Sequence, residues 1–272
     1  MSKTKKAREM KKLLNENLED KIGNKEMKAI ILAAGYGTRL GKLGENKPKA
    51  FMEVGGKPII DYIIEKVDKI NEIDRIIIVT NNKFYSFFDE WKAKAPTEKS
   101  IEIINDNTNS NEQRLGAMGD LYFALEKIYG DVEKVNDDLL VLASDNLFDF
   151  NLEELIKQRG RNVVGIRQDK KENLKGKYGV IELDGQGKVI GFQEKPEQPK
   201  SEYASMGIYL FRKDTLPLLK KYKQEGRNME GPGFFLEWLY KQKDVYGSPL
   251  KGKWYDIGSL EALEQAKKEF VG

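Results

Sequence analysis

The turn Gly35-Tyr36-Gly37-Thr38-Arg39 is followed a few residues later by a second basic cluster, Lys47-Pro48-Lys49. Glycines allow backbone N–H groups to approach a ligand closely, and nearby cations neutralise its negative charge. An apolar run over residues 29–34 precedes the turn and is long enough for one buried strand. A strand that ends in such a loop favours an anion-binding site, and we expect the anion to be a nucleoside triphosphate.

Two common phosphate-binding motifs are absent from this loop. The dinucleotide fingerprint G-x-G-x-x-G fails because Leu40 stands where the third glycine is needed. No register of the segment supplies the Walker A pattern G-x-x-x-x-G-K-[ST] either. The loop therefore belongs to neither of the commonest nucleotide-binding folds.

The chain of 272 residues contains no His and no Cys. This composition excludes Ser-His-Asp hydrolysis, histidine metal sites, thiol catalysis, thiolate zinc sites and disulfides. Any catalysis must use Asp, Glu, Lys or Arg, with or without a metal held by oxygen ligands. No apolar run approaches the roughly 18 residues of a membrane span, and there is no signal-peptide pattern. We therefore expect a cytoplasmic protein with no membrane partner.

The net charge of +3 comes from the first 27 residues, which hold eight basic and five acidic side chains. The remaining chain balances 39 basic against 39 acidic residues. It has no broad basic surface, so we expect no nucleic-acid partner.

Residues 1–27 have the pattern of a charged helical extension, in which apolar residues recur at spacings of three and four. These are Ala7, Met10, Leu14 and Leu18. One interpretation is a solvated extension. Another is a helix that packs its apolar stripe on the body or on a second subunit of a homo-oligomer. A third is that Met27 is an alternative start.

From residue 28 onward, apolar runs alternate with helical patterns, which predicts an α/β protein. In the first part, we expect strands at 29–34, 75–80, 101–104 and 139–143, and helices at 58–67, 84–95, 115–129 and 152–159. This alternation indicates a mainly parallel sheet covered on both faces. The second part looks more antiparallel, with strands at 163–167, 178–183, 188–193 and 204–211, and helices at 213–224, 234–241 and 260–270.

The segment LAAGYGTRL…KPKAF resembles the signature of the sugar-phosphate nucleotidyltransferases, the group of thymidylyl-, uridylyl-, guanylyl- and cytidylyltransferases. The resemblance continues through LASDN at 142–146, KYGVIELD at 177–184, GFQEKP at 191–196, residues 206–209, and KWYDIGSLEAL at 253–263. It implies a Rossmann-like three-layer α/β/α sandwich, with a mainly parallel mixed central sheet and an antiparallel elaboration in the second half. Residues 28–272 would form one domain, with a nucleotide-binding half at 28–160 and a sugar-binding half at 161–272. The chain ends soon after these motifs, so we expect no appended hexapeptide-repeat domain.

The implied reaction joins a sugar 1-phosphate to a nucleoside triphosphate and releases pyrophosphate. The attacking phosphate oxygen is already an anion at neutral pH, so a histidine-free chain needs no general base. The obstacle is the negative charge of the two substrates and of the leaving pyrophosphate, which calls for cations, a divalent metal and in-line positioning.

The resemblance assigns three cations and two metal ligands. Arg39 and Lys49 would reach the triphosphate, and Lys195 would bind the sugar phosphate. Asp145, at the end of a predicted strand, and Asp256 would ligate one Mg²⁺. Read alone, Arg39 suits a surface ion pair and Asp145 suits a helix cap.

The remaining assignments concern the nucleotide and the sugar. The nucleotide-binding residues implied in the glycine loop are Ala33, Ala34, Gly35, Gly37 and Thr38. Either Asn111 or Gln113, followed by Gly116, would contact the base, and the spacing to Gly116 favours Asn111 slightly. The base itself stays unassigned. The implied sugar-binding residues are Tyr178, Gly179, Glu194, Lys195 and Gly207.

Two alternatives remain open. The first is a CTP-dependent cytidylyltransferase that acts on a non-sugar phosphate such as phosphocholine. The motifs at residues 178–179 and 194–196 favour a sugar over such an acceptor. The second is a catalytically silent regulatory relative that binds nucleotide sugars. Retention of all five charged site residues argues against a silent protein.

Overall fold

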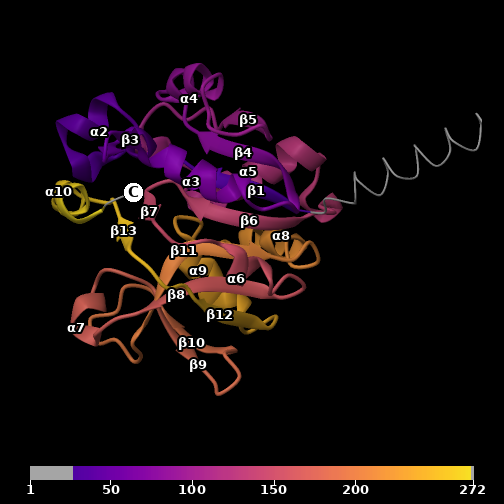
Figure 1. Cartoon of the computed structure of the whole chain (residues 1–272). Helices are drawn as coiled ribbons and strands as arrows, with labels where there is room; N and C mark the ends of the chain where they lie inside the picture. Colours follow the sequence, from indigo (N-terminus) through magenta and orange to yellow (C-terminus); the bar gives the residue numbers. More distant parts are fainter. Residues whose placement is uncertain (1–26, 271–272) are drawn as a thin grey trace, which may run out of the picture.

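A computed structural model describes residues 27–270, and within them nine strands form one sheet (Figure 1). The strand order is β10-β9-β11-β6-β1-β4-β5, and β8 pairs with β11 and with β12. The strands are β1 Met27–Leu32, β4 Ile73–Thr80, β5 Ser100–Asn105, β6 Asp138–Ala143, β8 Asn162–Gln168, β9 Val180–Leu183, β10 Val189–Gln193, β11 Tyr203–Phe211 and β12 Val245–Pro249.

The sheet is parallel at its centre and mixed toward one end, where β8 is antiparallel to β11 and parallel to β12. β1 runs parallel to β4 and β6, and β5 runs parallel to β4. β11 is antiparallel to β6 through its second part and to β9 through its first part. β9 and β10 therefore lie at the opposite end of the molecule from β5, as Figure 1 shows.

Helices cover both faces because successive strand residues point to opposite sides. Ile31 and Ile78 pack in a core with residues of α3, α4, α6 and α10, whereas Ile30 and Ile77 pack in a second core with α5, α8 and α9. The helices are α3 Ile59–Asp68, α4 Tyr85–Lys92, α5 Ala117–Tyr129, α6 Glu153–Ile156, α8 Pro217–Gln224, α9 Pro232–Leu239 and α10 Leu260–Glu269. The predicted three-layer α/β/α sandwich is thus confirmed.

Small elements decorate this framework. β7 Asn146–Phe148 pairs antiparallel with β13 Trp254–Asp256, and β2 Glu53–Val54 pairs with β3 Lys57–Pro58. Short helices form at α2 Lys42–Asn46 and α7 Lys171–Leu174. No helix within residues 27–270 is long and apolar enough to cross a membrane.

The predicted elements differ from the structure at several boundaries. β1 ends at Leu32, so Ala33 and Ala34 belong to the loop that follows it. α5 begins at Ala117 because Gly116 has a left-handed φ of 78°, which a helix residue does not adopt. α8 begins only at Pro217, a residue suited to a first helical turn. The edge strand β12 was not predicted. The helical extension was predicted over residues 1–27, but Met27 is the first residue of β1, and residues 1–26 lie outside the described residues.

Candidate active site

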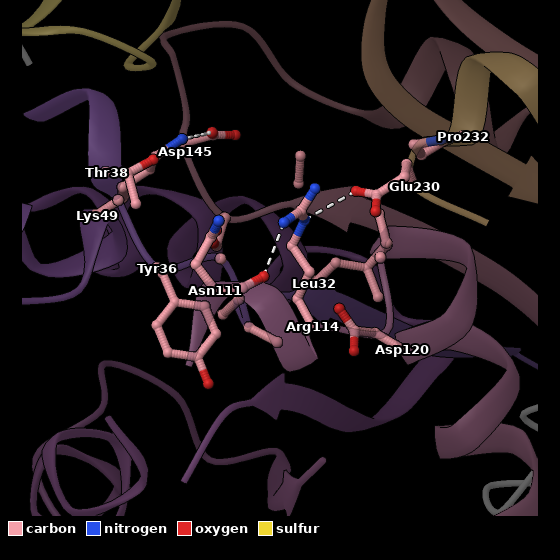
Figure 2. Close-up of a pocket in the computed structure, with 18 of the residues that line it drawn as sticks. Leu32, Tyr36, Thr38, Lys49, Asn111, Arg114, Asp120, Asp145, Glu230 and Pro232 are labelled. Carbon is pink, nitrogen blue, oxygen red and sulfur yellow. Dashed lines mark hydrogen bonds and ion pairs between the residues drawn. The ribbon is translucent and has the colours of Figure 1, made fainter. Parts of the chain in front are cut away.

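The loop after β1 lines a cavity of about 610 Å³, shown in Figure 2. Gly37 has a φ of 66° and packs against α2, where a Cβ on Gly44 would lie 2.1 Å from the Gly37 carbonyl oxygen. These two glycines let the loop fold back tightly on α2. All five loop residues predicted to bind nucleotide line the cavity: Ala33, Ala34, Gly35, Gly37 and Thr38.

Lys49 and Asp145 form an ion pair at this cavity. Lys49 lies in a 3₁₀ turn, Lys49–Phe51, and Asp145 follows the carboxyl end of β6. The Lys49 Nζ lies 2.8 Å from the Asp145 Oδ2, and both side chains are mostly buried. Asp145 thus lies beyond the carboxyl end of a parallel strand, as expected, whereas its ion pair with Lys49 was not predicted.

The β7–β13 ladder holds Asp256 beside Asp145. Asp256 is the last residue of β13, and the backbone N–H of Ile257 donates to the Asp145 carbonyl at 2.9 Å. Burial and then the negative charge of Asp145 raise the pKa of Asp256 to about 6, against the opposing effects of Lys49 and other nearby cations. Asp145 and Asp256 are far apart in sequence but lie close enough for the charge of one to raise the pKa of the other.

This pair of carboxyl groups fits a divalent cation. Within residues 27–270, no group of three or more Asp, Glu, His or Cys side chains is placed to hold a metal. A metal at Asp145 and Asp256 would therefore complete its coordination with phosphate and water, as Mg²⁺ commonly does. It would also relieve the repulsion that raises the Asp256 pKa.

Asn146 connects the β7–β13 ladder to the central sheet through hydrogen bonds. Its Nδ2 donates to the Met206 carbonyl at 2.7 Å, and its Oδ1 accepts from the Trp254 Nε1 at 3.1 Å. Gly207, with a φ of 70°, lies against this amide, and a Cβ there would approach the Asn146 Nδ2 to 2.9 Å. The predicted sugar-binding Gly207 thus gives Asn146 room. Asn146 was not predicted to have a site role, although it ends the LASDN segment.

A second cavity of about 200 Å³ adjoins the first. Its lining includes every predicted sugar-binding residue, namely Tyr178, Gly179, Glu194, Lys195 and Gly207, together with Asp256. Arg39, Asp145 and Lys195 line both cavities. The three predicted charges therefore stand where the two cavities meet.

Glu194 lies between glycines in the smaller cavity. A Cβ on Gly233 would lie 1.8 Å from the Glu194 Oε2, and one on Gly179 would lie 3.3 Å from the same atom. Burial raises the pKa of Glu194, and Lys195 opposes this effect. Lys195 itself has a φ of 45°, an uncommon left-handed conformation that suggests a functional constraint.

The first turn of α5 is hydrogen-bonded to the second half of the chain. The Met229 and Glu230 carbonyls accept from the N–H groups of Met118 and Ala117, at 3.0 and 3.1 Å. Residue 116 must be a glycine beside these carbonyls, because a Cβ there would lie 2.5 Å from the Met229 oxygen. Residues of both halves therefore build this end of the larger cavity.

The structure separates the two candidate base-binding residues. Asn111 lines the larger cavity, whereas the Gln113 Oε1 accepts from the Asn109 backbone at 3.0 Å and Gln113 is absent from both linings. Arg114 donates to Glu230 at 2.9 Å and to the Asn111 carbonyl at 2.7 Å (Figure 2). Neither Arg114 nor Glu230 was predicted, because their contact depends on tertiary structure.

Comparisons with known proteins identify relatives over nearly the whole described chain. The profile described as nucleotidyl transferase matches residues 28–271. The bifunctional protein GlmU of Methanocaldococcus jannaschii is 33% identical over 243 residues, which is 89% of this chain and 54% of that protein. GlmU of Methanococcus aeolicus is 32% identical over 233 residues, covering 85% of this chain and 51% of that protein. The chain thus spans about half the length of these curated relatives.

Two solved structures share the fold. A UDP-glucose pyrophosphorylase complexed with UDP-glucose superposes with a TM-score of 0.72 at 24% identity, covering 89% of this chain and 97% of that one. A candidate glucose-1-phosphate thymidylyltransferase from Bacillus anthracis, in complex with sucrose, has a TM-score of 0.71 at 24% identity and covers 90% and 97%. At this identity, the likeness supports the architecture alone.

Proposed function

This chain belongs to the nucleotidyl transferase family, and we propose that it joins a sugar 1-phosphate to a nucleoside triphosphate with Mg²⁺, giving an NDP-sugar and pyrophosphate. The observation that carries the proposal is the pair of adjoining cavities that share Arg39, Asp145 and Lys195. One cavity has a size suited to a nucleotide, and the other to a sugar. Their junction is the place for phosphate chemistry.

The reaction needs no proton acceptor. An ionised phosphate oxygen of the sugar 1-phosphate attacks the α-phosphorus of the triphosphate. The new O–P bond forms as the bond from the α-phosphorus to its bridging oxygen breaks, and pyrophosphate leaves with that electron pair. The absence of His from the chain is compatible with this chemistry.

Cations at the junction would bring two polyanions together. Arg39 and Lys49 neutralise the triphosphate and the charge that grows on the leaving pyrophosphate. Lys195, between the two cavities, holds the acceptor phosphate in line. Asp145 and Asp256 are the residues that would hold Mg²⁺, which supplies further charge neutralisation on the phosphates when bound.

The smaller cavity supports a sugar as the acceptor. The Glu194 carboxyl lines this cavity and can accept hydrogen bonds from hydroxyl groups, and the small residues Gly179 and Gly233 give it the room to pack there. A hydroxyl-rich ring offers the hydrogen-bond donors that this carboxyl group accepts.

Pyrophosphate release from a panel of nucleoside triphosphates and sugar 1-phosphates, with Mg²⁺ present, tests the proposal. We expect release from at least one pair. Asp145→Asn or Asp256→Asn should lower the rate by roughly a hundredfold or more. Glu154→Gln is the matched control, because Glu154 is exposed and lies outside both cavities. Failure of every pair would refute transferase activity, and full activity of either Asn variant would remove that residue from the metal site.

A further inference from the structure

The end of the larger cavity away from the charged junction holds a buried carboxyl group, Asp120 in the first turn of α5 (Figure 2). The residue is only 6% exposed, yet it lines the cavity with Asn111 and Tyr36. Its Oδ1 is buried and has no hydrogen-bond partner within residues 27–270. A buried polar atom left unpaired costs roughly 1–3 kcal/mol, so this oxygen requires a partner.

Asp106 is the neighbour of Asp120, and it is already supplied with donors. The Thr108 backbone N–H and hydroxyl donate to the Asp106 Oδ1 at 2.7 and 2.8 Å, and the same hydroxyl lies 2.9 Å from the Tyr36 hydroxyl. Within the described residues 27–270, no donor is placed in the same way against the Asp120 Oδ1. Two facing carboxyl groups form a hydrogen bond only if they share a proton, and this asymmetry assigns the proton to Asp120.

The charges around Asp120 agree with that assignment. Burial raises the pKa of Asp120 to about 8, and the negative charges of Asp106 and Glu230 contribute in the same direction. At neutral pH, Asp120 is therefore mainly a neutral acid that donates one O–H to Asp106. Its other oxygen remains a hydrogen-bond acceptor.

The location of Asp120 indicates which part of a nucleotide it meets. The cations Arg39, Lys49 and Lys195 line the cavity beside Asp145, and two of them also line the smaller cavity, which Asp120 does not. A triphosphate is drawn to the cations and gains nothing from a carboxyl group. The uncharged part of the nucleotide, its base, then extends toward Asp120 and Asn111. This step rests on the function proposed above.

We propose that Asp120 determines nucleobase specificity by accepting a hydrogen bond from an exocyclic amino group of the base. An amino-bearing base supplies a donor to the Asp120 oxygen that is not bonded to Asp106. A keto group at the same position, as in uracil or thymine, would place its oxygen against the Asp120 oxygen. Both atoms are acceptors, so neither would gain a hydrogen bond. The protein therefore prefers CTP to UTP, or ATP to its 6-keto counterpart ITP.

Equilibrium binding of these two matched nucleotide pairs to the full chain, with Mg²⁺ and without an acceptor, tests the inference. In the pair that binds more tightly, we expect the affinity for the amino nucleotide to exceed that for the keto nucleotide by roughly tenfold to a hundredfold. Asp120→Ala should bring that ratio close to one. Asp120→Asn should keep it, because its amide N–H donates to Asp106 and its amide oxygen accepts from the base. Glu126→Gln, an exposed acid of α5, should leave the ratio unchanged.

The outcomes separate this inference from the proposed function. A keto nucleotide that binds as well as its amino partner would overturn the role of Asp120 and leave nucleotidyl transfer intact. An unchanged ratio in folded Asp120→Ala would do the same. Failure of every nucleotide to bind would refute the proposed function and the inference with it. The wild-type ratio is decisive even if the Ala variant does not fold.

Discussion

Replacing Asp120 by Asn should flatten the pH dependence of stability between pH 5 and pH 7. The substitution keeps the size of the side chain and retains a donor toward Asp106. It removes an ionisation whose pKa is about 8 in the folded chain and about 3.9 in an unfolded one.

The pKa difference sets the sign and the size of the effect. Between these two values, the folded chain holds a proton on Asp120 that the unfolded chain has lost. Its contribution to stability is complete below about pH 4 and is lost as the pH rises toward 8. The slope is about 1.4 kcal/mol per pH unit, so wild type should lose about 3 kcal/mol relative to Asp120→Asn from pH 5 to pH 7.

Urea unfolding followed by tryptophan fluorescence at several pH values measures this difference. The quantity to compare is the free energy of unfolding of wild type minus that of Asp120→Asn at each pH. Glu126→Gln controls for the loss of an acid on the same helix and should follow wild type. Parallel curves for wild type and Asp120→Asn would mean that Asp120 is ionised throughout, and the reasoning about its shared proton would be refuted.

Three further substitutions or conditions test other parts of the site. Asn146→Ala leaves the buried Trp254 indole N–H unpaired, so the free energy of unfolding, measured with urea, should fall by roughly 1–3 kcal/mol. A loss below about 1 kcal/mol would contradict this role. Because burial and Asp145 raise the Asp256 pKa to about 6, protons should compete with Mg²⁺ below that pH. A Mg²⁺ titration whose midpoint is the same at pH 5 and pH 7 would exclude this competition. Ser259→Ala removes the side-chain cap of the Ala262 N–H and should lower stability by about 1 kcal/mol, and an unchanged thermal midpoint would show that the cap contributes nothing.

The central strands were predictable because a sheet covered on both faces requires continuous apolar runs, such as 76–79 in β4. β12 was missed because Gly247 and Pro249 interrupt its pattern. Its pairing with β8 is a tertiary contact that local sequence does not encode.

The candidate site divides in the same way. Asp145 and Asp256 were assigned through motif resemblance, since the short β7–β13 ladder that brings them together has no strong local signal. Asp120 was missed because an acid in the first turn of a helix usually just complements the helix dipole. It becomes unusual only where the end of β5 brings Asp106 against it.

The first backbone N–H groups of α5 are bonded to carbonyls at 229 and 230, and this has an evolutionary consequence. A chimaera that exchanged residues 161–272 for those of a relative would bring different capping residues to the wall of the proposed base pocket. Recombination at the boundary between the halves would then alter base choice together with acceptor choice. The two preferences are expected to be inherited as a pair, and lineages that change one should carry compensating changes around Gly116.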